Sequence, residues 1–284
     1  MFDIWNEKKP LAQQIYKKDN YKIIENPDCD GNDCVLFFSS HNVWFPNTEE
    51  SFRYSFVEND YYEWLKFSKI KAKKVIFFRD IFKQWYVTGI NEEINSIDKM
   101  ISFIKEQTMG MKIITVGSSA GGYAAALFAA VLNAERCICF SGQFTLIEGM
   151  EKSPLIKKYN DNQECSKWYE LKSYIEKSKT TVYYITPAYC KVDVLQYNYI
   201  KGTDNVKCLR TASKHHGVAV LKGNLFTLLS MNNSQLDALF DAYSNKITGK
   251  IRLSVSLCGF LKTLRCLAYE VKRLINTILR RSKK

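Results

Sequence analysis

The stretch that decides the fold runs Lys112-Ile113-Ile114-Thr115-Val116-Gly117-Ser118-Ser119-Ala120-Gly121-Gly122-Tyr123. Its apolar first part predicts a buried strand, and the Ala-rich segment up to Leu132 predicts a helix. Between them, Gly117 to Gly121 matches the pattern G-x-S-x-G, whose glycines lack the Cβ atoms that would clash in a strained turn. We therefore expect a strand-turn-helix elbow with Ser119 at its apex as a nucleophile. Ser118 is the other candidate.

Short apolar runs and amphipathic segments alternate on both sides of this elbow. The runs that predict strands are Cys34–Phe38, Lys74–Phe78, Lys112–Val116, Arg136–Phe140, Thr181–Ile185 and Val206–Leu209. The segments that predict helices contain Ile94 to Ile104, Tyr123 to Leu132, and Leu236 to Tyr243. Strands that alternate with helices predict an α/β fold, with a mostly parallel sheet covered by helices on both faces.

A serine hydroxyl is a weak nucleophile and needs a base, and the chain has three histidines. His215 and His216 follow the last predicted strand, where a base after the nucleophile and the acid is expected. We prefer His216, because Gly217 gives the loop the freedom to turn the ring toward the elbow. His215 is the alternative, and an exposed histidine pair without a catalytic role also fits.

The acid that orients such a histidine is expected after the strand that ends near Ile185. Asp193 is the first carboxylate there, and Asp204 is the alternative. A second N–H donor for a negatively charged oxygen is expected after an early strand, beside the backbone N–H of Ala120. Ser40 and His41 follow the strand Cys34–Phe38, and either backbone could supply it.

Composition and charge restrict the partners of the chain. Hydrophobic residues make up 46% of the 284 residues and charged residues 25%, as in a folded protein. The nine cysteines lack the spacing of a metal site, so we expect a reduced protein with no metal and no cofactor. Residues 251–284 carry nine Lys/Arg and one acid, and so supply +8 of the net charge of +12. Because the rest is only mildly basic, nucleic-acid binding is not expected.

Two parts of the chain are therefore expected: a catalytic domain over residues 1–247 and a basic amphipathic helical tail over 248–284. The segment Met1–Lys9 has no apolar run, and no segment is long and apolar enough to span a membrane. These features predict a cytoplasmic protein.

The elbow, Asp193 and the segment His216-Gly217-Val218-Ala219 together resemble the α/β-hydrolase superfamily, over about residues 20–245. Within it the chain resembles hydrolase-like proteins of bacterial surface-polysaccharide clusters and, more distantly, accessory-secretion proteins that O-acetylate glycans. The segments that carry this closer resemblance are Phe37-Phe38-Ser39-Ser40, Phe78-Arg79-Asp80 with Trp85-Tyr86, and Phe140-Ser141-Gly142-Gln143-Phe144. The chain departs from many esterases in lacking their HGGG pattern.

The resemblance implies an α/β-hydrolase fold and an acyl-enzyme mechanism on an ester. The expected function is that of a serine esterase or acyltransferase acting on a glycan or glycolipid intermediate of surface-polysaccharide synthesis. The alternative is a catalytically silent protein of the same fold that binds a partner through its tail.

The tail carries a regular apolar pattern. The residues Leu253, Leu257, Phe260, Leu264, Leu267, Val271, Leu274 and Ile278 follow at steps of three and four. Such spacing predicts one long helix with an apolar face, and the basic residues lie off that face. Three occupants of the face are open: an anionic membrane surface, which would place the protein peripherally at the inner face of the membrane, a partner helix, or the protein's own domain.

Overall fold

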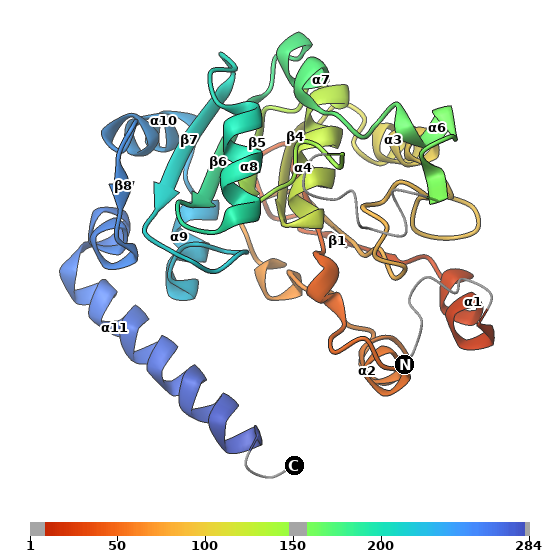
Figure 1. Cartoon of the computed structure of the whole chain (residues 1–284), viewed down its shortest axis with the longest axis horizontal. Helices are drawn as coiled ribbons and strands as arrows, with labels where there is room; N and C mark the ends of the chain where they lie inside the picture. Colours follow the sequence, from red (N-terminus) through yellow and green to blue (C-terminus); the bar gives the residue numbers. More distant parts are fainter. Residues whose placement is uncertain (1–8, 148–157, 282–284) are drawn as a thin grey trace.

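The computed structural model describes residues 9–147 and 158–281, and Figure 1 shows their arrangement. Within these residues, eight strands form one sheet in the order β1-β3-β2-β4-β5-β6-β7-β8. The strands are β1 (Tyr21–Glu25), β2 (Asp33–Phe38), β3 (Lys74–Phe78), β4 (Lys112–Ser118), β5 (Arg136–Phe140), β6 (Thr181–Pro187), β7 (Val206–Thr211) and β8 (Ile247–Thr248). Strand β1 is antiparallel to β3, and the described strands β2 to β8 are parallel to one another.

Helices connect the strands, and several of them begin at side-chain caps. They are α1 (Pro10–Tyr16), α2 (Glu49–Arg53), α3 (Ile97–Gln107), α4 (Ala120–Leu132), α6 (Gln163–Ser166), α7 (Lys172–Lys177), α8 (Lys191–Ile200), α9 (Leu225–Leu229), α10 (Asn233–Ala242) and α11 (Lys250–Arg281). Short turns of helix occur at η1 (His41–Val43), η2 (Tyr54–Glu58), η3 (Leu65–Phe67) and η4 (Lys222–Asn224). Ser96 caps α3 by accepting from the backbone N–H of Lys99, and Asn232 with Gln235 forms a capping box on α10.

The core lies on both faces of the sheet, because side chains of a strand alternate between faces. On one face Leu36 and Ile76 pack against α3 and α4, and Cys137 and Cys139 share this face as expected. On the other face Tyr183 packs against Phe240 of α10, in one cluster with residues of α9 and the start of α11. The expected mostly parallel sheet with helices on both faces is confirmed.

Two strands were not predicted. Every residue of β1 is at least partly exposed, since β1 forms the edge of the sheet, and so it lacks the apolar run of a buried strand. Strand β8 has two residues, which is too short to show a periodic pattern, and it pairs with Arg210 and Thr211 of β7. The expected boundary between residues 247 and 248 therefore falls inside a strand of the sheet.

The prediction of one continuous tail helix was wrong. Gly259 has φ 77° and ψ 171°, which interrupts α11 and divides it in two. Before this break, Leu253 and Leu257 are buried in the core beside α9 and α10. After it, Phe260 and Leu264 of the same predicted face are exposed, because the break turns the second half onto a different face. The described residues contain no helix long and apolar enough to cross a membrane.

Candidate active site

Ser119 occupies a strained turn between β4 and α4. Its backbone has φ 56° and ψ −123°, in a region that residues with a Cβ rarely adopt. Such a conformation costs on the order of 1–3 kcal/mol and persists only when neighbouring contacts hold it. Here the N–H of Ser119 donates to the carbonyl of Phe140 at 2.9 Å, and its own carbonyl accepts from the N–H of Tyr123 at 3.0 Å. The turn raises the Ser119 side chain out of the sheet to a partly exposed position.

Close backbone approaches explain the two outer glycines of the elbow. A Cβ atom on Gly117 would lie 2.0 Å from the carbonyl oxygen of Gly121. A Cβ atom on Gly121 would lie 2.2 Å from the carbonyl oxygen of Phe38. The elbow therefore rests directly on the end of β2, and this contact places the loop that follows β2 beside Ser119.

The structure brings His216 and Asp193 to Ser119 from two other loops. Nε2 of His216 lies 2.8 Å from Oγ of Ser119, and Nδ1 lies 3.0 Å from both carboxylate oxygens of Asp193. The Asp193 side chain is 1% exposed and the His216 side chain 35% exposed. With its Nδ1–H donated to the buried carboxylate, the imidazole leaves Nε2 free to accept the proton of the serine hydroxyl.

Local structure explains how these two side chains reach the elbow. Asp193 lies in the first turn of α8, where the positive end of the helix favours a carboxylate. Gly217 has φ 103°, which suits glycine, and its carbonyl accepts from the hydroxyl of Ser141 at 2.7 Å. Ser141 follows β5 and fixes the histidine loop, a role that local sequence pattern did not indicate.

The alternative residues lie elsewhere. Ser118 is the last residue of β4 and is buried. His215 is exposed, and its backbone N–H donates to the hydroxyl of Ser213. Asp204 is exposed in the turn before β7. It lies at the amino ends of the parallel strands, whereas Ser119 lies at their carboxyl ends.

Of the three backbone N–H groups expected to bind a negatively charged oxygen near Ser119, one is already engaged in another hydrogen bond. Ala120 is the first residue of α4, so its N–H has no partner within the helix. The N–H of Ser40 donates to the carboxylate of Glu63, and the Ser40 hydroxyl donates to the same group at 3.1 Å. Ser40 was therefore a wrong choice as an oxyanion donor. Within residues 9–147 and 158–281, no hydrogen bond engages the N–H of His41, which leaves it as the candidate from this loop.

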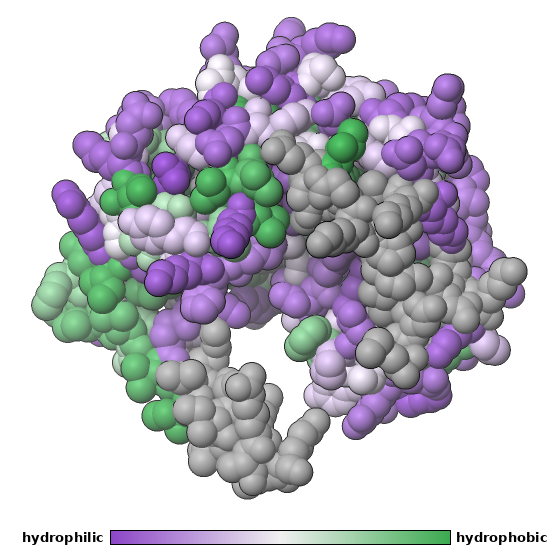
Figure 2. Space-filling view, in the orientation of Figure 1, coloured by the Kyte–Doolittle hydropathy of each residue, from purple (hydrophilic) through white to green (hydrophobic). Residues whose placement is uncertain are grey.

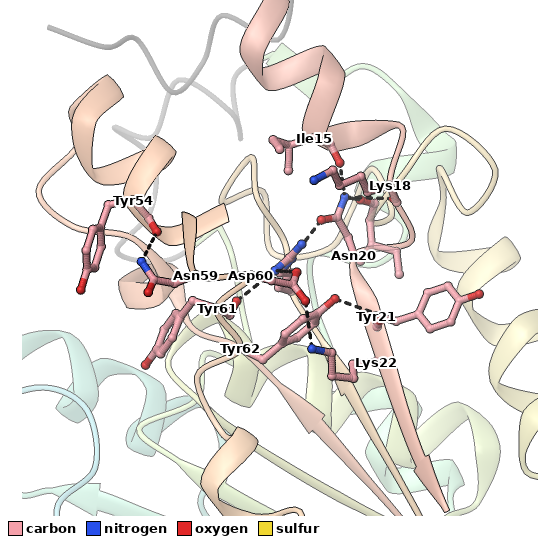
Figure 3. Close-up of polar contacts among 12 residues, drawn as sticks. Ile15, Lys18, Asn20, Tyr21, Lys22, Tyr54, Asn59, Asp60, Tyr61 and Tyr62 are labelled. Atoms are coloured by element: carbon pink, nitrogen blue, oxygen red, sulfur yellow. Dashed lines mark hydrogen bonds and ion pairs between the residues drawn. The ribbon is translucent and has the colours of Figure 1, made fainter. Parts of the chain in front are cut away.

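The contact of Glu63 with Ser40 was not predicted from the sequence. The buried side chain of Arg79 holds the segment that precedes Glu63. The guanidinium of Arg79 pairs with Asp60 at 2.9 Å and donates to the carbonyl of Tyr61 at 3.1 Å. Figure 3 shows Asp60, Tyr61 and Tyr62 beside Asn20 and Lys22 of the first strand and the turn before it. Lys22 pairs with Asp60 at 2.9 Å, and the Tyr62 hydroxyl donates to the carbonyl of Tyr21 at 2.9 Å. These contacts tie the segment before Glu63 to the edge of the sheet.

The side chain of His41 packs against the ring of Trp85, with 4.4 Å between ring centroids. Its Nε2 is buried and has no hydrogen-bond partner in the described part of the chain. Burial, together with the positive charge of Lys83 and the nearby His216, lowers the pKa of His41 to about 3. His41 is therefore neutral near pH 7 and does not compete with His216 for a proton.

The described residues contain one group with the chemistry of a metal site, and it overlaps the site above. One ligand atom each of Cys190, Asp193 and His216 lie within 4.8 Å of one another. A metal bound there would occupy the atoms that Asp193 and His216 use to contact each other. The arrangement suits proton transfer between Ser119 and His216.

The parallel strands β2 to β8, the positive-φ serine between β4 and α4, and the acid and histidine after later strands define a fold of the α/β-hydrolase type. No family model matches the chain, and no curated protein sequence matches it significantly.

Solved structures of this fold type are similar to the chain. The capsule O-acetyltransferase of Neisseria meningitidis serogroup A is 14% identical, with a TM-score of 0.48 over 68% of this chain and 83% of that one. A Staphylococcus aureus protein of unknown function is 14% identical, with a TM-score of 0.49 over 80% of this chain and 97% of that one. The S. aureus fluorophosphonate-binding serine hydrolase F is 10% identical, with a TM-score of 0.43 over 81% and 94%. At identities this low, the chemistry of this chain is inferred from its own residues.

Proposed function

We propose that this protein is a serine esterase or acyltransferase that works through an acyl-enzyme on Ser119. The observation that carries this proposal is the aligned chain of atoms from the buried Asp193 carboxylate through His216 to Oγ of Ser119, with distances of 3.0 and 2.8 Å. A structural role does not require a serine hydroxyl within hydrogen-bond distance of a histidine, whereas a serine nucleophile needs such a base beside it.

The proposed reaction follows from these positions. Nε2 of His216 takes the hydroxyl proton as Oγ of Ser119 attacks the ester carbonyl, and the N–H groups of Ala120 and His41 receive the negative oxygen. The leaving alcohol takes the proton from His216 as its bond to the acyl carbon breaks, and an acyl-serine remains. Water or a sugar hydroxyl then gives its proton to His216 and takes the acyl group, and His216 returns this proton to Oγ of Ser119 as the acyl-serine bond breaks. Asp193 holds the ring and stabilises its charged form throughout.

The substrate class belongs to the same proposal. The resemblance of segments such as Phe37–Ser40 to hydrolase-like proteins of surface-polysaccharide clusters supports a glycan or glycolipid intermediate as the acyl donor or acceptor. The alternative, a silent protein of the same fold, has no need of the contact between His216 and Ser119.

The test is covalent labelling with a fluorophosphonate probe, followed by mass spectrometry. We expect a label on Ser119 in the unchanged protein and in Ser118→Ala, and none in Ser119→Ala. Ser118 is the matched control because it is the same residue type one position away. A label on another residue, or no label on a folded protein, would contradict the proposal. Comparing alcohol release with free acid release, with and without a glycan acceptor, separates transfer from hydrolysis.

A further inference from the structure

The second half of α11 contacts the domain through a narrow and largely polar face. The Sγ of Cys266 donates to the side-chain oxygen of Asn224 at 2.9 Å. The carboxylate of Glu270 accepts from the backbone N–H of Lys222 at 2.7 Å. Thr263, one turn before Cys266, is also buried. This face needs no large apolar side chain, so the apolar residues of the helix lie elsewhere.

The apolar residues after the break form a separate exposed stripe. They are Phe260, Leu261, Leu264, Val271 and Ile275, with exposed fractions from 47% to 75%. At about 100° per residue, these positions fall within one sector of the helix about 100° wide. Figure 2 shows hydrophobic surface over α11, in contrast to the mainly hydrophilic surface around it. The described domain leaves this stripe uncovered.

Positive charge accompanies the stripe. Lys262, Arg265 and Lys272 are exposed, and at the same helical spacing Arg265 and Lys272 lie next to one border of the stripe. The one acid between residues 260 and 281, Glu270, already accepts a hydrogen bond from the domain. An apolar stripe with cationic side chains at its border is the pattern of a helix that lies in the interface of an anionic bilayer.

A second copy of the chain fits the same surface less well. A two-helix coiled coil uses a narrow seam and opposite charges beside it. Two copies of this helix would place Arg265 and Lys272 near the same cations of the partner, with no free acid from the described part of the helix to pair with them. Gly259 also separates the stripe from Leu253 and Leu257, which shortens the seam that the sequence predicted.

We propose that residues 260–275 of α11 bind an anionic membrane surface. Ser119 lies at the carboxyl end of β4, and the second half of α11 extends beyond the carboxyl ends of the parallel strands (Figure 1). Membrane binding through this stripe would hold the Ser119 side of the sheet near the bilayer. This placement rests on the proposed function and deepens it, because it selects an amphiphilic or lipid-linked substrate.

The test is co-sedimentation of the full chain with vesicles of phosphatidylcholine alone or mixed with phosphatidylglycerol. We expect binding to the mixed vesicles at low salt and a large loss of binding at high salt, because salt screens exposed charges. The triple variant Leu261→Ser, Leu264→Ser, Val271→Ser should reduce the bound fraction about tenfold. Reversing Lys262, Arg265 and Lys272 to Glu should abolish the preference for anionic lipid.

The matched control is Met109→Ser with Leu195→Ser, two apolar residues exposed elsewhere, which should bind as the unchanged protein does. Urea midpoints check that all variants fold. No binding to anionic vesicles would overturn the proposal, and so would a dimer in solution that the triple variant abolishes. Fluorophosphonate labelling of Ser119 in the same variants distinguishes the two proposals. If only the membrane proposal is wrong, Ser119 is still labelled although the protein does not bind vesicles. If only the proposed enzymatic function is wrong, the protein still binds vesicles although Ser119 is not labelled.

Discussion

The carboxylate of Glu63 accepts hydrogen bonds from both the backbone N–H and the hydroxyl of Ser40. Ser40 caps the turn η1, which begins at His41, so this contact fixes the loop that carries the candidate oxyanion donor. Burial raises the pKa of Glu63, and the two hydrogen bonds from Ser40 oppose that rise. In the proposed mechanism, Glu63 positions the oxyanion donor by holding this loop.

Glu63→Ala should lower kcat for ester hydrolysis by about ten- to a hundred-fold, because a displaced N–H donor no longer meets the developing oxyanion. KM should change little, since the donor acts mainly in the transition state. Steady-state kinetics measures both. Glu58→Ala, at an exposed glutamate in the same segment, is the control. Unchanged kcat in Glu63→Ala would show that the loop does not need this contact.

Asp193→Asn should lower kcat by a factor on the order of 10⁴, because an amide cannot serve as the charged acceptor for Nδ1–H of His216 and favours the wrong tautomer. The same substitution at the exposed Asp204 should leave kcat unchanged. The measurement is steady-state kinetics of ester hydrolysis, which gives kcat for each variant. Equal rates for the two variants would remove Asp193 from the proposed mechanism.

Gly121→Ala should destabilise the fold by about 3 kcal/mol or more, because the new Cβ would lie 2.2 Å from the carbonyl oxygen of Phe38 and force the elbow away from β2. Gly249→Ala is the control, since a Cβ there meets no atom within 4 Å. Urea denaturation gives the free energy of unfolding of each variant. A cost below about 1 kcal/mol at Gly121 would mean that the elbow moves easily.

His41 should make stability depend on pH. Its pKa is lowered from 6.5 to about 3 in the fold by burial and by neighbouring Lys83 and His216, so between these values the unfolded chain binds a proton that the folded chain does not. The free energy of unfolding therefore falls as pH falls below 6.5. Between pH 7.5 and 4.5, His41→Phe should remove up to about 3 kcal/mol of this loss while keeping a ring against Trp85. Urea unfolding at the two pH values measures it, with His215→Phe as the control; an equal loss in His41→Phe and the unchanged protein would contradict the prediction.

The sequence by itself determined the elements whose signals are local. Apolar runs marked six of the strands, since burial on both faces requires continuous apolar side chains, and the glycines around Ser119 marked the elbow because backbone sterics act over a few residues. Chain order also pointed to Asp193 and His216, although not to the helix turn that carries Asp193.

Only the tertiary structure decided the features that depend on contacts between distant segments. Three contacts join parts of the chain that share no local pattern. The N–H of Ser40 donates to Glu63, the hydroxyl of Ser141 donates to the carbonyl of Gly217, and the two-residue strand β8 pairs with β7. The tail shows the same limit. Its apolar spacing predicted one helix with one face, but a backbone turn at Gly259 and a polar contact surface at Asn224 divided that face into a buried half and an exposed half. Periodicity reports which residues share a side of a helix, whereas the packing of the rest of the chain decides what that side meets.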